Sequence, residues 1–343
     1  MKKYYLSKNY KEHNSAGNKA KIDIEDVIIN LGYNNAGLPR TIHKNQLISF
    51  FYTLVSVIKS IFVLSRGDIL FLQYPFKKYY AFVCKVAHWK KAKIITLIHD
   101  LGSFRRKKLT VEKEIYHLNN SDVLIVHNEK MKNWLLQYGY SRPMIYLEIF
   151  DFLSQTSPVR ENTTPSGVTY KVAYAGALNF KKNKFLYSMD GIIHNWNFSL
   201  YGNGFDKNLI NNKKKFFYNG FLSSDRLIES VDADFGLVWD GDSTNTCSGN
   251  FGEYLKLNNP HKTSLYIRCQ LPIIIWKEAA LATLVLEEKI GLCINSLDEL
   301  DSILASLSPE MYSEMKQNTI RICERLSSGY YITQALRRAE LML

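Results

Sequence analysis

Residues 258–276, Asn-Asn-Pro-His-Lys-Thr-Ser-Leu-Tyr-Ile-Arg-Cys-Gln-Leu-Pro-Ile-Ile-Ile-Trp, indicate the fold more clearly than any other part of the sequence. Pro260, with polar residues around it, predicts the start of a short helix and is expected at the first helical position. After a turn at Pro272, the apolar run that ends at Ile275 predicts a buried strand. A short helix that leads into a buried strand is typical of an α/β fold.

Lys262 falls in the first turn of this predicted helix. Unpaired N–H groups and the helix dipole favour an anion there, so the charge of a lysine gains nothing from the dipole. A phosphate in front of the helix would explain the lysine. The alternative is an ordinary surface helix whose lysine is solvated.

The composition is that of a globular protein with two domains. The chain has 343 residues, of which 46% are hydrophobic and 22% charged, and it is too long for one core of ordinary size. Its five cysteines are scattered without a Cys-x-x-Cys pair, which argues against a disulfide framework or a zinc site and favours a reducing compartment. The N-terminus lacks the apolar core of a signal peptide, so we expect a cytoplasmic location.

Residues 47–64 are apolar apart from a few polar positions. Thr53, Ser56, Lys59 and Ser60 recur at helical spacing, which predicts an amphipathic helix packed on a sheet rather than a membrane span. A helix that lies in a membrane surface is the alternative.

The positive charge is concentrated in the first half of the chain. Residues 1–150 hold 24 Lys and Arg against 11 Asp and Glu, whereas the remaining residues hold 20 against 21. The excess gathers at residues 77–78, 85–93 and 105–108. It favours an anionic partner such as membrane lipid, a pyrophosphate-linked substrate or nucleic acid, although a solvated face is the alternative.

Strands and helices alternate in both halves, which predicts parallel sheets with right-handed crossovers. In the first half we expect strands at residues 68–74, 93–98, 122–126 and 144–147, and helices at 22–30, 79–89, 111–117 and 129–138. In the second half we expect strands at 171–176, 197–202, 216–221, 235–239, 271–275 and 291–294, the last at an edge, before a helical tail at 309–343. The sequence thus predicts an α/β fold of two doubly wound, Rossmann-like domains that face each other across a cleft.

The domain boundaries follow from a stretch of linker composition. Residues 153–169 are rich in Ser, Thr and Pro. We therefore expect one domain at 1–152 and a second at 170–325. Residues 326–343 are expected to form a C-terminal helix that packs back on the first domain.

Five short motifs in the second half resemble those of the GT-B glycosyltransferases. The resemblance is to the bacterial group of β-1,6-galactofuranosyltransferases and of the glucosyltransferases that extend sugars on serine-rich adhesins. The motifs are Ala175-Gly176-Ala177-Leu178, Leu200-Tyr201-Gly202-Asn203-Gly204, Asn219-Gly220-Phe221, Gly236-Leu237-Val238-Trp239-Asp240 and Asn259-Pro260-His261-Lys262. The resemblance implies a GT-B fold whose C-terminal domain binds a nucleotide-sugar, usually linked to UDP, and whose N-terminal domain binds the acceptor.

The expected donor site lies where the strands of the second domain end. Gly176 and Gly202 let a diphosphate approach bare backbone, and Lys262 supplies charge. Since Ala177 stands where related enzymes often have an arginine, further charge must come from elsewhere. For Lys181 and Lys182 a solvated turn is the alternative, as is core packing for Phe221. The donor-site candidates are Gly176, Lys181, Lys182, Tyr201, Gly202, Gly220, Phe221, Asp240, Asn259, His261, Lys262 and Thr263.

The expected catalytic residues follow the strand at residues 93–98. His99-Asp100 resembles the His-Asp motif that GT-B enzymes place beside the donor sugar. An inverting transfer needs one base for the acceptor hydroxyl, and Asp100 is the candidate, with His99 as a hydrogen-bond partner of the sugar. His127 is the second candidate for the base. The alternative is that Asp100 and His99 serve only the structure.

A polar loop at residues 14–20 is expected to lie by the substrate. Gly17 and Asn18 are the contacts expected there, and Arg105 is expected on the acceptor side.

Asp240-Gly241-Asp242 matches the Asp-x-Asp pattern that holds Mn²⁺ or Mg²⁺ in GT-A glycosyltransferases. Because that fold has one domain, we expect no metal and no other cofactor. A metal-dependent Asp-x-Asp enzyme remains the alternative.

The sequence therefore predicts an inverting glycosyltransferase that moves a hexose (galactofuranose, galactose or glucose) from a UDP-sugar to a saccharide. The basic half suggests an acceptor on a lipid pyrophosphate and peripheral contact with the inner face of the cytoplasmic membrane, as in capsule or surface-polysaccharide assembly. A homo-oligomer is possible. No nucleic-acid-binding motif is visible, so we expect no nucleic-acid partner. A nucleic-acid-binding protein and a non-catalytic nucleotide-sugar-binding protein are the alternatives.

Overall fold

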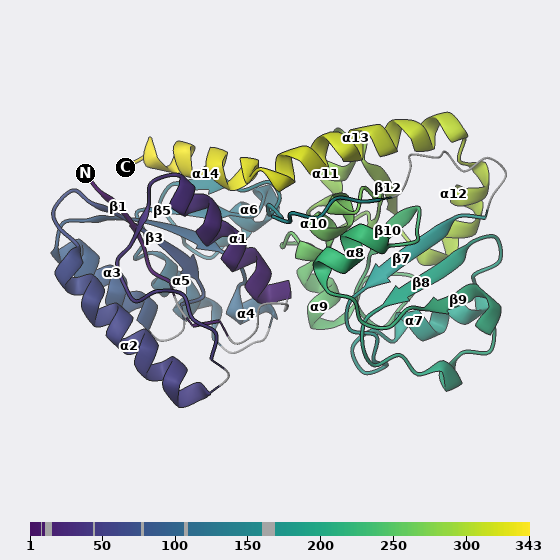
Figure 1. The fold of residues 1–343 in the computed structure, drawn as a ribbon, viewed down its shortest axis with the longest axis horizontal. Helices are drawn as coiled ribbons and strands as arrows, with labels where there is room; N and C mark the ends of the chain where they lie inside the picture. The colour runs from purple at the N-terminus through teal and green to yellow at the C-terminus, as the bar shows by residue number, and fades with distance from the viewer. Residues whose placement is uncertain (8, 11–15, 44, 77–78, 106–108, 160–168) are drawn as a thin grey trace. The chain divides into compact units, whose positions relative to one another are not determined.

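The computed structural model describes the chain except residues 8, 11–15, 44, 77–78, 106–108 and 160–168. It divides into two compact units. Unit 1 comprises Met1–Asp151 and Gly329–Leu343, and unit 2 comprises Phe152–Ser328. Each unit contains a parallel sheet with helices packed around it (Figure 1). The prediction of a two-domain, Rossmann-like α/β fold is thereby confirmed.

The sheet of unit 1 has the strand order β2-β1-β3-β4-β5-β6. Its strands are β1 (Lys3–Tyr5), β2 (Asn34–Asn35), β3 (Ile69–Tyr74), β4 (Lys93–Ile98), β5 (Val123–Val126) and β6 (Met144–Tyr146). Its helices are α1 (Ala16–Asn30), α2 (Gln46–Val63), α3 (Tyr80–Trp89), α4 (Gly102–Arg105), α5 (Val111–Leu118), α6 (Glu129–Gln137) and α14 (Tyr330–Glu340). The four strands predicted for this half are confirmed to within a residue or two. The short strands β1 and β2 had no pattern by which to predict them.

The sheet of unit 2 has the order β12-β11-β10-β7-β8-β9. Its strands are β7 (Lys171–Ala175), β8 (Asn197–Tyr201), β9 (Phe216–Tyr218), β10 (Phe235–Val238), β11 (Ile273–Trp276) and β12 (Gly291–Ile294). Its helices are α7 (Phe185–Ser188), α8 (Ser224–Ser230), α9 (Gly249–Tyr254), α10 (His261–Arg268), α11 (Ala282–Glu287), α12 (Leu300–Ser306) and α13 (Pro309–Ser327). All six predicted strands are confirmed, and β12 is an edge strand as expected.

The strand order of unit 2 fixes where a ligand is expected. Read from β9, the strands follow the order 3-2-1-4-5-6 of a doubly wound dinucleotide-binding sheet. The order reverses between β7 and β10, which are neighbours. Ligands of open α/β sheets bind outside the carboxyl ends of the strands at such a switch point.

The helical tail is split between the two units at Gly329. This residue has a φ of 72°, and a Cβ there would lie 2.4 Å from a side-chain carbon of Val27, so glycine is required. Helix α13 ends in unit 2 at Ser327, and α14 lies in unit 1. The buried Asp151 caps α14, because its carboxylate accepts hydrogen bonds from the backbone N–H groups of Tyr331 (3.1 Å) and Ile332 (2.7 Å).

Helix α2 forms where it was predicted, but its hydroxyl-bearing side is buried and its apolar side is exposed. Its buried side carries small and hydroxyl-bearing residues, namely Ser49, Thr53, Ser56, Val57 and Ser60. The buried hydroxyls find local partners: Thr53 Oγ1 donates to the Ser49 carbonyl (2.7 Å), and Ser56 Oγ accepts from the backbone N–H of Leu38 (2.8 Å). The large apolar residues are exposed instead. The expectation of an apolar face packed on the sheet was wrong, because small residues let this helix approach its neighbours closely.

Candidate active site

The loops that follow β7, β8 and β9 are hydrogen-bonded to one another at the carboxyl edge of the unit 2 sheet. The Gly176 N–H donates to the Tyr201 carbonyl (2.9 Å), and the Gly202 N–H donates to the Gly220 carbonyl (2.7 Å). The three glycines predicted for the donor site therefore lie on adjacent strand ends. Together they form a rim of bare backbone at the switch point.

Gly202 is the position where this rim requires glycine most strongly. Its φ is 146°, and a Cβ there would lie 1.8 Å from the Gly176 carbonyl oxygen. Any side chain at this position would push the two loops apart.

Lys262 is bound within a cluster at the same edge. Its Nζ donates to Asp240 Oδ1 (3.0 Å) and lies 3.3 Å from the Tyr174 hydroxyl and 3.4 Å from the Trp239 carbonyl. The ammonium also lies over the Tyr174 ring, 4.5 Å from its centroid. The interpretation of Lys262 as a solvated surface lysine was therefore wrong. Asp240 supplies its countercharge, so the lysine needs no phosphate to be accommodated.

Tyr174 and Tyr266 support this cluster from the core. The Tyr174 hydroxyl donates to Asp240 Oδ1 (3.2 Å), and burial raises the pKa of Tyr174 well above its usual value. The Tyr266 hydroxyl accepts from the Ala175 N–H (2.7 Å), which ties α10 to the end of β7. Neither tyrosine was predicted, because only the fold shows that they reach the strand ends.

Helix α10 begins one residue later than predicted. Pro260 is the N-cap and His261 the first helical residue, and within the described chain no side chain caps the helix. The ring of His261 stacks on Phe152, with 4.8 Å between centroids and 22° between planes. Asn259 and Thr263 are buried, and Thr263 Oγ1 has no hydrogen-bond partner among the described residues.

The remaining donor-site candidates differ in their surroundings. The Tyr201 hydroxyl is used inside the fold, where it accepts from the Asp232 N–H (3.1 Å), so only its backbone lies at the rim. Phe221 is exposed, which rules out the core-packing interpretation. Lys181 is exposed, and Lys182 places its Nζ over the Phe251 ring, 5.0 Å from the centroid.

The two carboxylates of the Asp-x-Asp triplet lie in different environments. Asp240 is largely buried against Lys262, whereas Asp242 is exposed. Among the described residues, no group of three or more His, Cys, Asp or Glu is arranged to hold a metal ion.

In unit 1, His99 and Asp100 follow β4 directly. The His99 ring stacks on Phe150 (5.3 Å between centroids), and its Nε2 donates to the Gln73 side-chain oxygen (2.7 Å), since the Gln73 amide nitrogen donates to the Lys21 carbonyl. Both oxygens of Asp100 lie 2.6–2.7 Å from Nη1 of Arg105. The structure thus pairs two predicted residues of this unit, Asp100 and Arg105, beside the buried His99 that precedes Asp100 in the chain.

Glu114 holds the loop that carries Asp100. Its carboxylate is fully buried and accepts from the backbone N–H groups of Gly102 (2.8 Å) and Ser103 (2.9 Å) and from the Tyr74 hydroxyl (2.8 Å). The amides at the start of α4 are thereby occupied. Glu114 was not predicted, because in the sequence it is one polar residue of an ordinary amphipathic helix.

His127, the second candidate for the base, is buried. Its Nε2 donates to the Ile98 carbonyl (2.9 Å), and its ring packs edge-on against Phe150 (4.9 Å). Burial lowers the pKa of His127 to about 4, so the imidazole is neutral at physiological pH.

The predicted polar loop at residues 14–20 is partly helical. Gly17 and Asn18 belong to the first turn of α1, so the expectation that they lie in a loop was wrong. Residues 14 and 15 lie outside the described residues.

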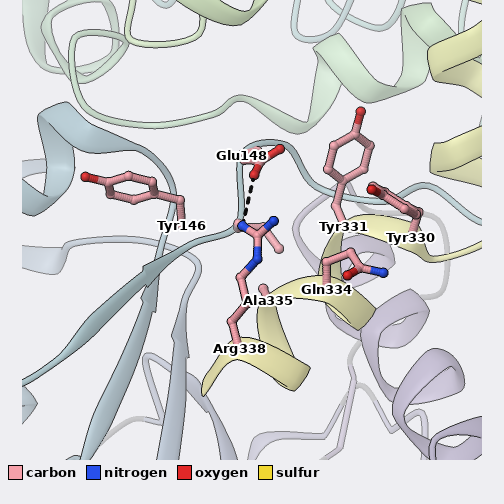
Figure 2. A pocket seen from close by; sticks show the side chains of 8 residues that line it. Tyr146, Glu148, Tyr330, Tyr331, Gln334, Ala335 and Arg338 are labelled. Atoms are coloured by element: carbon pink, nitrogen blue, oxygen red, sulfur yellow. Dashed lines mark hydrogen bonds and ion pairs between the residues drawn. The ribbon is translucent and has the colours of Figure 1, made fainter. Parts of the chain in front are cut away.

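A small pocket in unit 1 lies between the end of β6 and α14. Figure 2 shows Arg338 reaching from α14 toward Glu148, with a distance of 3.4 Å between Nη1 and Oε1. Tyr330, Tyr331 and Gln334 also line the pocket. It has room for about one water molecule and is therefore too small for a sugar.

Both halves of the chain match known glycosyltransferase domains. The glucosyltransferase 3-like N-terminal domain family matches residues 3–149, and the corresponding C-terminal domain family matches residues 172–339. The chain is 30% identical over 334 residues, 97% of each sequence, to the β-1,6-galactofuranosyltransferase WbbI of Escherichia coli (strain K12). It is 26% identical over 321 residues to glucosyltransferase 3 of Streptococcus gordonii, covering 87% of this chain and 90% of that protein.

Solved structures share the fold at low sequence identity. The lipopolysaccharide outer core galactosyltransferase WaaB aligns with a TM-score of 0.58 at 12% identity over 99% of each chain. A DNA-modifying β-glucosyltransferase aligns with a TM-score of 0.52 at 15% identity, also over 99% of each chain. The chain thus belongs to the glucosyltransferase 3-like family and is a glycosyltransferase of GT-B fold.

Proposed function

We propose that this glycosyltransferase transfers a hexose from a UDP-sugar to a saccharide hydroxyl. The observation that carries the proposal is the Lys262–Asp240–Tyr174 cluster at the switch point between β7 and β10, beside the bare backbone of Gly176 and Gly202. A cation held beside unobstructed backbone suits a diphosphate. The names of the two curated relatives support galactofuranose or glucose as the transferred sugar.

In this proposal Lys262 and the start of α10 stabilise the leaving group. An ammonium has three donors, so Lys262 can keep its bond to Asp240 and still donate to a phosphate oxygen. Lys262 itself lies in the first turn of α10, where the helix dipole favours negative charge. Because this charge is in place before the bond breaks, it stabilises the diphosphate that develops in the transition state.

We propose that Asp100 is the base and that the transfer inverts the configuration at the anomeric carbon. The carboxylate takes the proton of the acceptor hydroxyl as that oxygen attacks the anomeric carbon, and UDP leaves. Arg105 holds both oxygens of Asp100, so this ion pair has to open or share when the acceptor hydroxyl arrives. His99, fixed by Gln73 and Phe150, is positioned as a hydrogen-bond partner for the sugar.

The proposed reaction is independent of a metal ion. Asp240 Oδ1 already accepts from Lys262 and Tyr174, so Lys262 takes the place that a divalent cation occupies in an Asp-x-Asp site. Turnover that survives a chelator supports this. Turnover that is lost on chelation and restored by Mn²⁺ would favour the metal-dependent alternative.

We propose that the acceptor is carried on a lipid pyrophosphate, with the basic unit 1 in peripheral contact with the inner face of the membrane. The charge segregation supports this, because residues 1–150 hold all of the excess of Lys and Arg. None of the helices in the described ranges combines the length and apolar character of a membrane-spanning segment.

The experiment that tests the donor site measures UDP binding by calorimetry and UDP release from UDP-glucose, UDP-galactose, UDP-N-acetylglucosamine and UDP-galactofuranose. Lys262→Met, which keeps a long side chain without the charge, is expected to weaken UDP binding about 10- to 100-fold. Lys214→Met, which removes an exposed lysine that precedes β9 and so lies at the amino edge of the same sheet, is the matched control and is expected to change binding little. Wild-type affinity in Lys262→Met, with a normal melting temperature, would overturn the proposed site.

A further inference from the structure

Helix α2 presents its large apolar side chains to solvent along its whole length. The exposed apolar residues recur every three or four positions and thus form one stripe on the helix: Leu47, Ile48, Phe51, Val55, Ile58 and Phe62. Phe51 is 60% exposed and Phe62 is 80% exposed. The helix of 18 residues is about 27 Å long, and the stripe runs along nearly all of it.

Helix α3 lies beside α2 in unit 1 (Figure 1) and also carries exposed aromatic residues. Phe82 and Trp89 are both exposed, Trp89 by 76%. They lie seven residues apart, so they share one face of α3, and the exposed Lys85 lies between them on that face. The outer surface of α2 and α3 is called the α2–α3 face below.

The contacts of the buried side of α2 show that the helix is firmly held with its apolar side exposed. Its small and hydroxyl-bearing side is packed and hydrogen-bonded, and Ser60 Oγ donates to the Val57 carbonyl (2.6 Å) in the same way as Thr53 bonds to Ser49. Rotating α2 to bury the aromatic residues would expose that side and break the Ser56–Leu38 bond (2.8 Å). The apolar stripe therefore faces outward in the stable fold.

The charge around the α2–α3 face is positive. Between Val27 and His99 the sequence has ten Lys and Arg but one acidic residue, Asp68. Asp68 is buried and accepts from the backbone N–H groups of Lys2 (2.9 Å) and Ser65 (3.0 Å). Neither α2 nor α3 has an acidic residue. The described basic side chains in the two helices and in the segments that follow them are Lys59, Arg66, Lys85, Lys90, Lys91 and Lys93.

We infer that the α2–α3 face inserts into the surface of an anionic lipid bilayer, with the stripe from Leu47 to Phe62 and the rings of Phe82 and Trp89 below the headgroups. A helix with an apolar face, beside lysines and without carboxylates, has the composition of one that lies in a membrane interface. A second copy of the chain fits less well, because a two-fold contact would place the same basic side chains opposite each other.

The inference deepens the proposed membrane contact, and it rests on that part of the proposed function alone. Vesicle binding requires no sugar and no acceptor. UDP binding reports on unit 2. A failure of one therefore leaves the other standing, and the two measurements are made on the same variants.

The test is flotation of the full chain with vesicles of phosphatidylcholine alone and of phosphatidylcholine mixed with phosphatidylglycerol. The wild-type protein is expected to float with the anionic vesicles, to float less as salt is added, and to remain mostly unbound with the neutral ones. The double variant Phe51→Ser, Phe62→Ser is expected to lose about tenfold or more of its partitioning. Its UDP affinity is expected to be unchanged.

The matched control is the double variant Leu136→Ser, Leu286→Ser, which removes two exposed apolar side chains elsewhere on the chain. It is expected to bind vesicles like the wild type. Trp89 gives a readout of insertion because it is the most exposed of the five tryptophans: Trp196, Trp239 and Trp276 are fully buried, and Trp134 on α6 is half-buried. Brominated lipid is expected to quench the fluorescence of the wild type more than that of Trp89→Phe.

Three results would overturn the inference. The first is no flotation with anionic vesicles. The second is undiminished flotation of Phe51→Ser, Phe62→Ser. The third is a lipid-free dimer that this double variant abolishes, because the face would then be an interface between two copies of the chain.

Discussion

At the scale of single residues, Lys262 and Asp100 are each held by one oppositely charged partner. Asp240 holds Lys262 in unit 2, and Arg105 holds Asp100 in unit 1. The sequence did not show that these residues are paired. Asp240 and Lys262 lie 22 positions apart, and Asp100 and Arg105 lie 5 positions apart, each pair in segments of different structure. Paired charges are oriented before substrate arrives, which is what electrostatic catalysis requires.

The proposed role of Asp100 as base is tested by Asp100→Asn. The amide has the same shape but accepts no proton, so turnover is expected to fall about 10²- to 10⁴-fold while UDP affinity stays at the wild-type value. Calorimetry and UDP-release kinetics measure the two quantities. Turnover within a few fold of wild type would assign the base elsewhere.

At the scale of secondary-structure elements, the loop after β7 and the loop after β8 pack so closely that Gly202 leaves no room for a side chain beside the Gly176 carbonyl. Gly202→Ala places a Cβ against the Gly176 carbonyl and is expected to destabilise the chain by about 3 kcal/mol and to weaken UDP binding. Gly191→Ala is the control, since a Cβ there meets no atom within 4 Å. Urea unfolding and calorimetry measure both effects. Equal stability of the two variants would contradict the tight contact.

The cap of helix α14 gives the chain a pH-dependent stability. Burial raises the pKa of Asp151 from 3.8 to about 7, although the N–H groups of Ile332 and Tyr331 oppose the shift. Because the folded pKa of this carboxyl lies above its unfolded pKa, the folded state binds more protons between these values, and the free energy of unfolding falls as pH rises from about 4 to about 7.

Asp151→Asn removes this titration while retaining an oxygen that accepts from α14. In wild type, this titration is expected to lower the free energy of unfolding by about 4 kcal/mol over the full shift, and the variant is expected to lack that decrease. Urea unfolding between pH 5 and pH 8 measures the difference. Parallel stability curves for wild type and variant would show that Asp151 does not titrate in this range.

At the scale of the whole molecule, the two units are expected to have separate tasks. Amide hydrogen exchange with and without UDP is expected to show protection in the Gly176, Gly202 and Gly220 loops and in the first turn of α10. The strands of unit 1 are expected to change little. Protection that appears mainly around β4 and α4 would place the nucleotide in unit 1 and contradict the assignment.

The sequence by itself determined the alternation of elements and the strands of both sheets. Buried parallel strands read as continuous apolar runs, and this local signal survives without any tertiary information. It also determined the motifs at the strand ends, since glycines and a proline-led helix start are local features. Lys262, His99 and Asp100 were selected as candidates in this way.

Only the tertiary structure decided which way side chains face and which ones meet. The spacing in α2 predicted a two-sided helix correctly but could not show that its hydroxyl-bearing side is buried, because that depends on how closely the neighbouring elements approach. Glu114 and Asp151 became structural carboxylates only when folding placed helix N–H groups in front of them. Periodicity is a property of the chain alone, whereas burial and pairing are properties of segments brought together from distant parts of the sequence.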